Sequence, residues 1–123
     1  MPLMPEPTVW FNPECSKCRT AQGILEERGV AADYVDYLHE PPTAVELRRV
    51  LSLMGTDDAR TIARTGERQW AELGLDRASN DAILEAMVQH PILIERPIVI
   101  VGDRAIVARP PERILELLDT PGA

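Results

Sequence analysis

The sequence predicts an α/β fold: a mixed four-stranded sheet with flanking helices and an all-helical insert between the second and third strands. Two observations lead to this prediction. Apolar residues recur first in the order strand, helix, strand, then only in helical patterns, and finally as strand, strand, helix. The 123 residues, 45% hydrophobic and 27% charged, are also enough for one globular domain with its own core. We therefore expect a single domain over residues 1–123, with the helical insert at about 43–90.

The first part of the chain has the pattern of a strand, a helix and a second strand. Residues 8–11 are apolar and end at the turn pair Asn12-Pro13. A helix is expected over about 16–28, because small and apolar residues recur there at helical spacing and a glycine follows. A second strand is expected over 34–38. A crossover of this length favours a parallel strand pair with the helix packed on one face.

The middle of the chain has only helical patterns. Thr43 and Glu46 have the spacing of a capping box, which begins a helix that we expect to end at Gly55. The other helices are expected over 57–63, over 67–73, and from Ser79-Asn80 to His90-Pro91, where the proline ends the helix.

The last part of the chain returns to strands. Residues 98–101 and 104–108 are strand candidates, and Gly102-Asp103 between them is suited to a hairpin turn. Pro110-Pro111 then opens a final helix. This order of elements is that of the thioredoxin-like fold.

Composition and charge exclude several classes of function. The chain has 20 acidic and 13 basic residues, a net charge of −7, which argues against nucleic-acid binding because that function needs a basic face. No apolar run approaches the roughly 18 residues of a membrane span. Residues 1–7 lack the charge and apolar run of a secretory signal. We therefore expect a cytoplasmic protein with neither nucleic acid nor membrane as a partner.

Cys15 and Cys18 are candidate catalytic residues. They follow a predicted strand and stand at the start of a predicted helix, where free N–H groups and the helix dipole lower the pKa of a thiol. Cys15 is the expected nucleophile, and Cys18 lies one turn further on, within reach for a short disulfide. A metal site needs two more ligands, and only His39 and His90 remain, so we expect no metal. A role for both cysteines as small core residues stays open.

Three arginines are candidate anion-binding residues. Arg96 precedes Pro97 at the opening of the third strand, where thioredoxin-like folds often have a cis-proline beside the active cysteine. Arg109 follows the fourth strand, again before proline, and Arg64 lies in the helical insert. A guanidinium binds an oxyanion through two parallel hydrogen bonds. Taken singly, however, each arginine is more simply explained as a solvated surface residue.

Several sequence runs together carry a resemblance to a known family. In chain order, across about residues 8–118, they are Asn12-Pro13-Glu14-Cys15-Ser16, Tyr37-Leu38-His39-Glu40-Pro41-Pro42, Leu73-Gly74-Leu75, His90-Pro91-Ile92-Leu93-Ile94-Glu95-Arg96-Pro97-Ile98-Val99 and Arg109-Pro110-Pro111-Glu112. In these runs the chain resembles the glutaredoxin-coupled arsenate reductases and their close relatives. The first run combined with the fourth is the specific part of the resemblance.

The resemblance implies an enzyme, an oxidoreductase that reduces arsenate or a similar oxyanion in arsenic detoxification. By position, Cys15 is the nucleophile, and the oxyanion is bound by Arg64, Arg96 and Arg109. Asn12 and Pro97 would shape the site. No bound cofactor is implied. An external thiol donor, either glutathione with glutaredoxin or thioredoxin, would supply the electrons and be the protein partner.

Two residues depart from the family pattern. Phe11 stands where described members often have a histidine that helps to activate the cysteine, so activation is left to the helix terminus and the arginines. Cys18 stands where glutathione-dependent members commonly have another residue. A second cysteine permits an internal disulfide, and hence recycling of the thioredoxin type.

Two other functions stay open at this point. The first is a general thiol–disulfide oxidoreductase that uses Cys15 and Cys18, with the arginines incidental. The second is a redox-sensing regulator resembling the Spx proteins, which share the fold and a Cys-x-x-Cys motif and dock on RNA polymerase. The joint presence of the three arginines argues against a regulator, and a polymerase pull-down would distinguish it.

Overall fold

The computed structural model describes residues 5–119, which form two compact units. The sheet unit contains the chain up to Asp36 and again from Arg96, and the helical insert is Tyr37–Glu95. Residues 1–4, part of the stretch in which we expect no secretory signal, lie outside the described residues. That the whole chain acts as a single domain stays a prediction.

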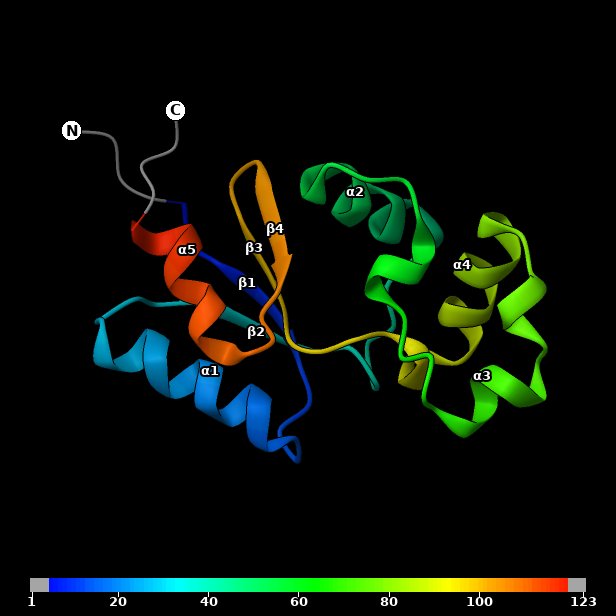
Figure 1. Ribbon diagram of the computed structural model, residues 1–123. Coiled ribbons are helices and arrows are strands. Elements are labelled where there is room, and N and C mark those ends of the chain that lie inside the picture. The colour runs from blue at the N-terminus through cyan, green and yellow to red at the C-terminus, as the bar shows by residue number, and fades with distance from the viewer. Residues whose placement is uncertain (1–4, 120–123) are drawn as a thin grey trace. The chain divides into compact units, whose positions relative to one another are not determined.

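The sheet unit contains a four-stranded mixed sheet in the order β2-β1-β3-β4 (Figure 1). Its strands are β1 (Thr8–Phe11), β2 (Asp33–Asp36), β3 (Ile98–Val101) and β4 (Arg104–Val107). β1 pairs parallel with β2, while the β1–β3 and β3–β4 pairs are antiparallel. The predicted thioredoxin-like fold class is therefore confirmed, and the helical insert lies between β2 and β3 as expected.

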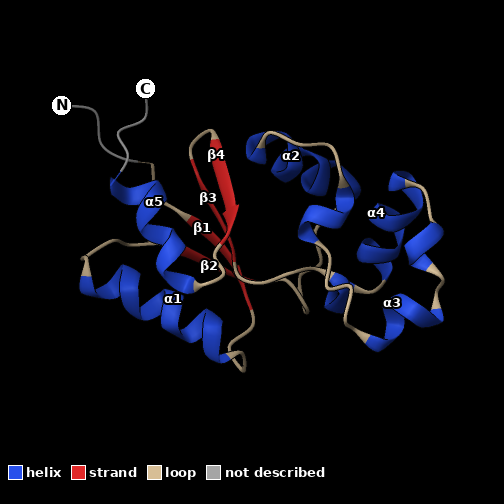
Figure 2. Ribbon diagram, viewed as in Figure 1, coloured by secondary structure: helices blue, strands red, loops and turns tan. Residues whose placement is uncertain are grey.

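Helices α1 (Ser16–Glu27) and α5 (Ile114–Asp119) cover one face of this sheet (Figure 2). Their apolar side chains pack with those of the two central strands because the helical period of 3.6 and the strand period of two each bring apolar residues to one face. The buried cluster comprises Val9, Ala21, Leu25, Val99, Val101, Ala108, Ile114 and Leu117. This packing holds α1 against the face of the sheet.

The helical insert is built from α2 (Ala44–Met54), α3 (Arg68–Glu72) and α4 (Asn80–Gln89), joined by short 3₁₀ turns. The predicted capping box begins α2: the Thr43 hydroxyl accepts from the Glu46 N–H, and Glu46 accepts from the Thr43 N–H, each at 3.1 Å. Gly55 ends α2 with a φ of 82°, a conformation that glycine adopts without strain. No helix in residues 5–119 is long and apolar enough to cross a bilayer.

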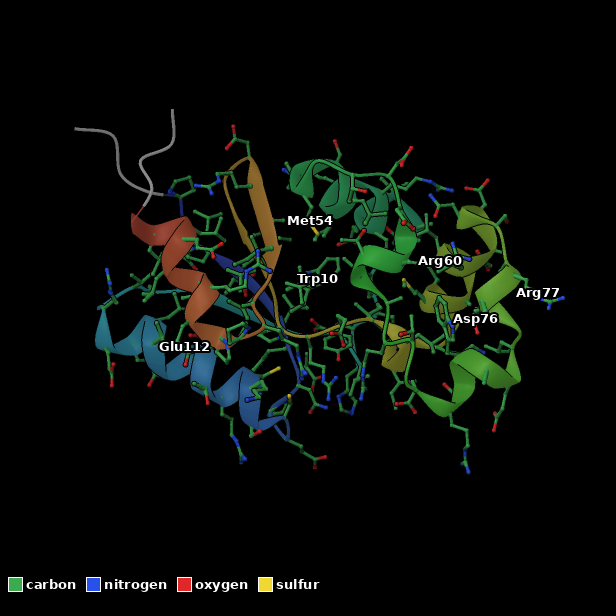
Figure 3. All side chains as sticks on the ribbon, in the orientation of Figure 1. Trp10, Met54, Arg60, Asp76, Arg77 and Glu112 are labelled. Carbon is green, nitrogen blue, oxygen red and sulfur yellow. The ribbon has the colours of Figure 1, made fainter. Side chains whose placement is uncertain are left out.

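Polar side chains hold the turns of the insert together. Arg60 donates to three backbone carbonyls, those of Leu75, Asp76 and Ala78. The buried indole N–H of Trp70 donates to the Asp76 carboxylate at 2.6 Å. Figure 3 labels Arg60 and Asp76 in this part of the insert. These contacts stabilise the conformation of helices and turns that are too short to be stable by themselves.

The predicted element bounds differ from the structure in several places. β2 covers Asp33–Asp36 rather than 34–38, because Tyr37 and Leu38 lie in a turn that leads into the insert. The segment 57–63 is only a 3₁₀ turn, Ala59–Ile62, and β4 ends at Val107. The turns Leu75–Arg77 and Pro91–Leu93 were not predicted, and the final helix begins as the 3₁₀ turn Pro111–Arg113. Short 3₁₀ turns lack the apolar periodicity from which longer helices are predicted.

Replacing Tyr34 with phenylalanine is expected to raise the free energy of unfolding by about 1 kcal/mol. The Tyr34 ring lies beside that of Phe11, with centroids 5.1 Å apart, but its buried hydroxyl has no hydrogen-bond partner in the described structure. Phenylalanine keeps the ring and removes the unsatisfied group. Urea unfolding measures the change; a loss of stability would show that the hydroxyl has a partner after all.

Candidate active site

The loop between β1 and α1 carries both cysteines and is organised by Asn12. The Asn12 side-chain oxygen accepts from the Glu14 N–H at 2.9 Å, which closes a tight polar turn. The Asn12 carbonyl accepts from the Cys15 N–H at 2.9 Å, and the Asn12 N–H donates to the Cys18 Sγ at 3.5 Å. One residue thus contacts both cysteines, and its predicted role in shaping the site stays a prediction.

Cys15 occupies the N-cap of α1, where its extended backbone (φ −87°, ψ 122°) precedes the first helical turn. No side-chain hydrogen bond caps this helix, so its first N–H groups are available to an anion. Cys15 is partly exposed, and Cys18 is fully buried one turn later. Both are free cysteines. The predicted placement of the two thiols at the helix start is confirmed.

The surroundings of Cys15 lower its pKa to about 7. Burial acts in the opposite direction and raises the pKa, but four groups outweigh it. They are the Cys18 N–H, the Cys18 thiol, the Lys17 N–H and the positive charge of Arg96. The thiolate, which is the nucleophilic form, is therefore more populated at neutral pH for Cys15 than for an ordinary cysteine.

Cys18 has the opposite character, since its pKa is raised to about 12. Burial is the main cause, and the neighbouring Cys15 adds to it, while the Asn12 N–H and Arg96 act in the other direction. Cys18 therefore remains protonated over the physiological range and can donate its proton to the Cys15 thiolate. The two thiols form an asymmetric pair: an accessible nucleophile beside a buried, protonated partner.

The rate of Cys15 alkylation by iodoacetamide is expected to rise with pH and to reach half its plateau near pH 7. The sign follows from the lowered pKa: the reactive thiolate forms as the pH rises through that value. Mass mapping of the labelled peptide follows each cysteine separately. Cys18 is the internal control and should stay unlabelled across the same range. A midpoint near about 8.5, the value of an unperturbed thiol, would contradict the proposed environment.

Arg96, just before the start of β3, and Arg109, just after the end of β4, both lie near Cys15. The Arg109 Nε donates to the Arg96 carbonyl at 2.7 Å, and the terminal Nη2 of Arg109 lies 3.9 Å from the Cys15 Sγ. Both arginines precede a cis peptide bond, to Pro97 and Pro110 respectively. Pro97 is buried, and its carbonyl accepts from the Ala108 N–H at 2.9 Å, which joins the start of β3 to the end of β4. The Cys15 thiol at the N-terminus of α1 is thus in contact with the Arg109 guanidinium and feels the positive charge of Arg96.

Arg64 lies in the helical insert and has its own partners there. Its guanidinium lies 3.5 Å from a Glu67 oxygen and 3.9 Å from a Glu95 oxygen, and it donates to the Ile92 carbonyl at 3.3 Å. All of these partners belong to the insert. The role of Arg64 as an oxyanion ligand therefore stays a prediction.

Phe11 contributes no activating group to the site. Its ring packs against Tyr34 and the core of the sheet unit. The low pKa of Cys15 arises from the other groups described above. No cluster of three potential metal-ligating side chains lies within residues 5–119.

Sequence reasoning missed two features of the site. The first is the Arg96 carbonyl, which holds the Arg109 side chain, and the second is the pair of carboxylates around Arg64. Every residue has a backbone carbonyl, so the sequence contains no signal that the carbonyl of Arg96 is an acceptor for Arg109. The second had a weak one, since Glu67 follows Arg64 at a spacing that brings side chains together in a helical turn.

The fold and the site define a class of protein: a thioredoxin-like fold with a low-pKa cysteine at the N-cap of α1 and two arginines beside it. Comparisons with known proteins identify the family. Residues 10–117 match the model of the ArsC family, so this chain belongs to that family.

Individual relatives agree with this assignment. The chain is 45% identical over 117 residues to a protein named arsenate reductase from Neisseria meningitidis, covering 94% of this chain and all of that protein. A solved structure titled as a putative arsenate reductase from Yersinia pestis superposes with a TM-score of 0.87 at 40% identity, covering 90% of this chain and 99% of the other. The structure titled as the arsenate reductase of Vibrio cholerae gives 0.87 at 39% identity, covering 90% and 96%.

Proposed function

We propose that this protein is an arsenate reductase with Cys15 as its nucleophile. The observation that carries the proposal is the position of the Cys15 thiol, which has a pKa of about 7 and faces the end of the Arg109 guanidinium at 3.9 Å. Arsenate is a dianion at neutral pH, so a thiolate can approach it only when positive groups compensate the charge. Arg96, Arg109 and the free N–H groups of α1 supply that compensation. The names of the relatives support arsenate as the substrate.

The proposed reaction begins with attack of the Cys15 thiolate on arsenic. A sulfur–arsenic bond forms, and one arsenate oxygen takes up protons and leaves as water. A second thiolate then attacks the Cys15 sulfur, a disulfide forms, and the electron pair of the broken sulfur–arsenic bond stays on arsenic. Arsenic is thereby reduced from the +5 to the +3 state and leaves as arsenite, while two thiols are oxidised to one disulfide. In this scheme Arg64 supplies a third guanidinium to the oxyanion.

We propose Cys18 as the second thiol. It is tethered three residues from Cys15, and tethering raises the effective concentration of a reactant by several orders of magnitude. Its high pKa falls once the Cys15 charge is lost to the arsenate adduct, because that charge is one cause of the raised value. The resulting internal disulfide would be reduced by thioredoxin. Such donors are kept reduced in the cytoplasm, where we place the protein.

Arsenate-dependent oxidation of NADPH tests the proposal directly. The purified protein is coupled in parallel to thioredoxin with its reductase and to glutathione with glutaredoxin. Turnover that requires arsenate in at least one system supports the function. No arsenate-dependent turnover in either system contradicts it.

A general thiol–disulfide oxidoreductase is the second candidate. The asymmetry of the two thiols, with pKa values near 7 and 12, is suited to dithiol exchange by itself. The same assay separates the two functions when arsenate is replaced by a small disulfide. A protein that reduces the disulfide but not arsenate is the general oxidoreductase.

A further inference from the structure

Two carboxylates approach the guanidinium of Arg64. Glu67 and Glu95 both approach it, at 3.5 and 3.9 Å, so the cluster of Arg64, Glu67 and Glu95 has one positive and two negative groups. The three side chains are about three-quarters buried, with exposed fractions of 24%, 23% and 24%. Charges in such a setting are screened less than those on an open surface.

The backbone holds this cluster in place. Arg64 and Glu95 lie on two short segments that pair in an antiparallel bridge between Ala63 and Ile94. The Arg64 N–H donates to the Leu93 carbonyl, and the Glu95 N–H donates to the Ile62 carbonyl, both at 2.8 Å. The Glu67 N–H donates to the Arg64 carbonyl at 3.0 Å. Because the backbone is already held in place, little conformational entropy is lost when the ion pairs form. That loss is the usual cost of such contacts.

Arg109 has a different environment. Its guanidinium contacts the Arg96 carbonyl and the Cys15 sulfur, and no carboxylate pairs with it in the described part of the chain. An oxyanion can therefore bind to Arg109 without displacing a carboxylate. For Arg64 the same step requires the guanidinium to give up at least part of its contact with Glu67 or Glu95.

We propose that Glu67 and Glu95 are internal competitors for Arg64, which set how tightly this protein binds oxyanions. The proposal rests on the proposed function of Arg64 as an oxyanion ligand. When no oxyanion is bound, the two carboxylates satisfy the guanidinium. Binding of a tetrahedral oxyanion replaces one or both of them. The free energy of the lost ion pairs makes the free energy of oxyanion binding less favourable. Glu67 and Glu95 are thus affinity-determining residues without being ligands themselves.

Glu67→Gln, Glu95→Gln and the double variant test the proposal, with sulfate as the probe. Sulfate has the shape of arsenate but is not reduced by thiols, so its binding is measured apart from turnover. The readout is the sulfate concentration that halves the rate of Cys15 alkylation, at constant ionic strength. The double variant is expected to need roughly three- to tenfold less sulfate than the wild type, the effect of two weak ion pairs. Each single variant should give part of that gain.

Two matched variants make the result specific. Glu72→Gln removes the same charge at the last residue of α3, the helix that Glu67 precedes as N-cap. Glu72 pairs only with the exposed Arg68 in the described structure, so this variant should leave sulfate binding unchanged. Arg64→Gln added to the double variant should remove the gain. A gain of equal size in Glu72→Gln would show a general charge effect and overturn the proposal. So would a gain that persists without Arg64, or no gain at all.

Failure of this inference and failure of the proposed function give different results. If sulfate protects wild-type Cys15 and the glutamine variants bind it no better, only the competition is wrong. If sulfate does not protect wild-type Cys15, the oxyanion site itself is wrong. The single variants and their urea unfolding midpoints keep the test valid if the double variant folds poorly.

Discussion

Replacement of Cys15 by serine is expected to abolish arsenate reduction with every thiol donor. The serine hydroxyl is not ionised at neutral pH, and its oxygen cannot form a disulfide with a second thiol, so neither chemical step is available. The loss should reach the background of the coupled NADPH assay. Residual arsenate-dependent turnover in Cys15→Ser would show that another thiol starts the reaction.

Cys18→Ser is the matched variant, because it makes the same change one turn further along α1. We expect it to slow turnover sharply with thioredoxin, since the internal disulfide can no longer form. Full thioredoxin-dependent activity of Cys18→Ser would refute the role of Cys18 as the second thiol. Equal activity of wild type and Cys18→Ser with glutathione and glutaredoxin would make Cys18 a packing residue instead, in agreement with its complete burial.

Removal of the Arg109 side chain is expected to weaken sulfate protection of Cys15 by roughly ten- to a hundredfold, the effect of a lost hydrogen bond to a charged group. Arg109 is both held in place and directed at the site: one nitrogen donates to the Arg96 carbonyl and another lies near Cys15. Arg109→Ala removes both contacts. The measurement is the sulfate concentration that halves the alkylation rate.

Arg109→Lys should be nearly as damaging as Arg109→Ala, because one ammonium group cannot hold the carbonyl and also present a planar pair of donors to an oxyanion. Arg113→Ala is the control, since Arg113 also donates to a strand carbonyl, that of Val107, and pairs with Glu116. It should leave protection intact. Unchanged protection in both Arg109 variants would favour the general oxidoreductase.

The fold could be predicted wherever long apolar patterns decide the structure. The strands 8–11 and 98–101 have the predicted bounds, and the capping box of Thr43 with Glu46 begins α2 as expected. The prediction was wrong at the end of β2, where Tyr37 continues the apolar pattern but the chain turns into the insert. The pattern of apolar residues alone cannot distinguish a strand from an apolar turn, because both bury apolar side chains.

The site could be predicted in its residues but not in its contacts. Cys15, Arg96 and Arg109 come together as the sequence motifs indicated, since the antiparallel β1–β3 and β3–β4 pairs bring the end of β1, the start of β3 and the end of β4 to the same end of the sheet. The carbonyl that orients Arg109 and the carboxylates that hold Arg64 depend on three-dimensional packing.

The sheet unit is discontinuous along the chain, and this has a consequence for folding during synthesis. β1 leaves the ribosome before the insert, but one of its two neighbours, β3, follows the entire insert, as the pairing of Trp10 with Ile98 shows. The insert is one uninterrupted stretch, whereas the sheet cannot be completed until the strands that follow the insert have been made. Arg96 and Arg109 both follow the insert as well. While the insert is being made, the nascent chain therefore carries Cys15 without the nearby charge of Arg96, which is one of the groups that lower the pKa of this thiol.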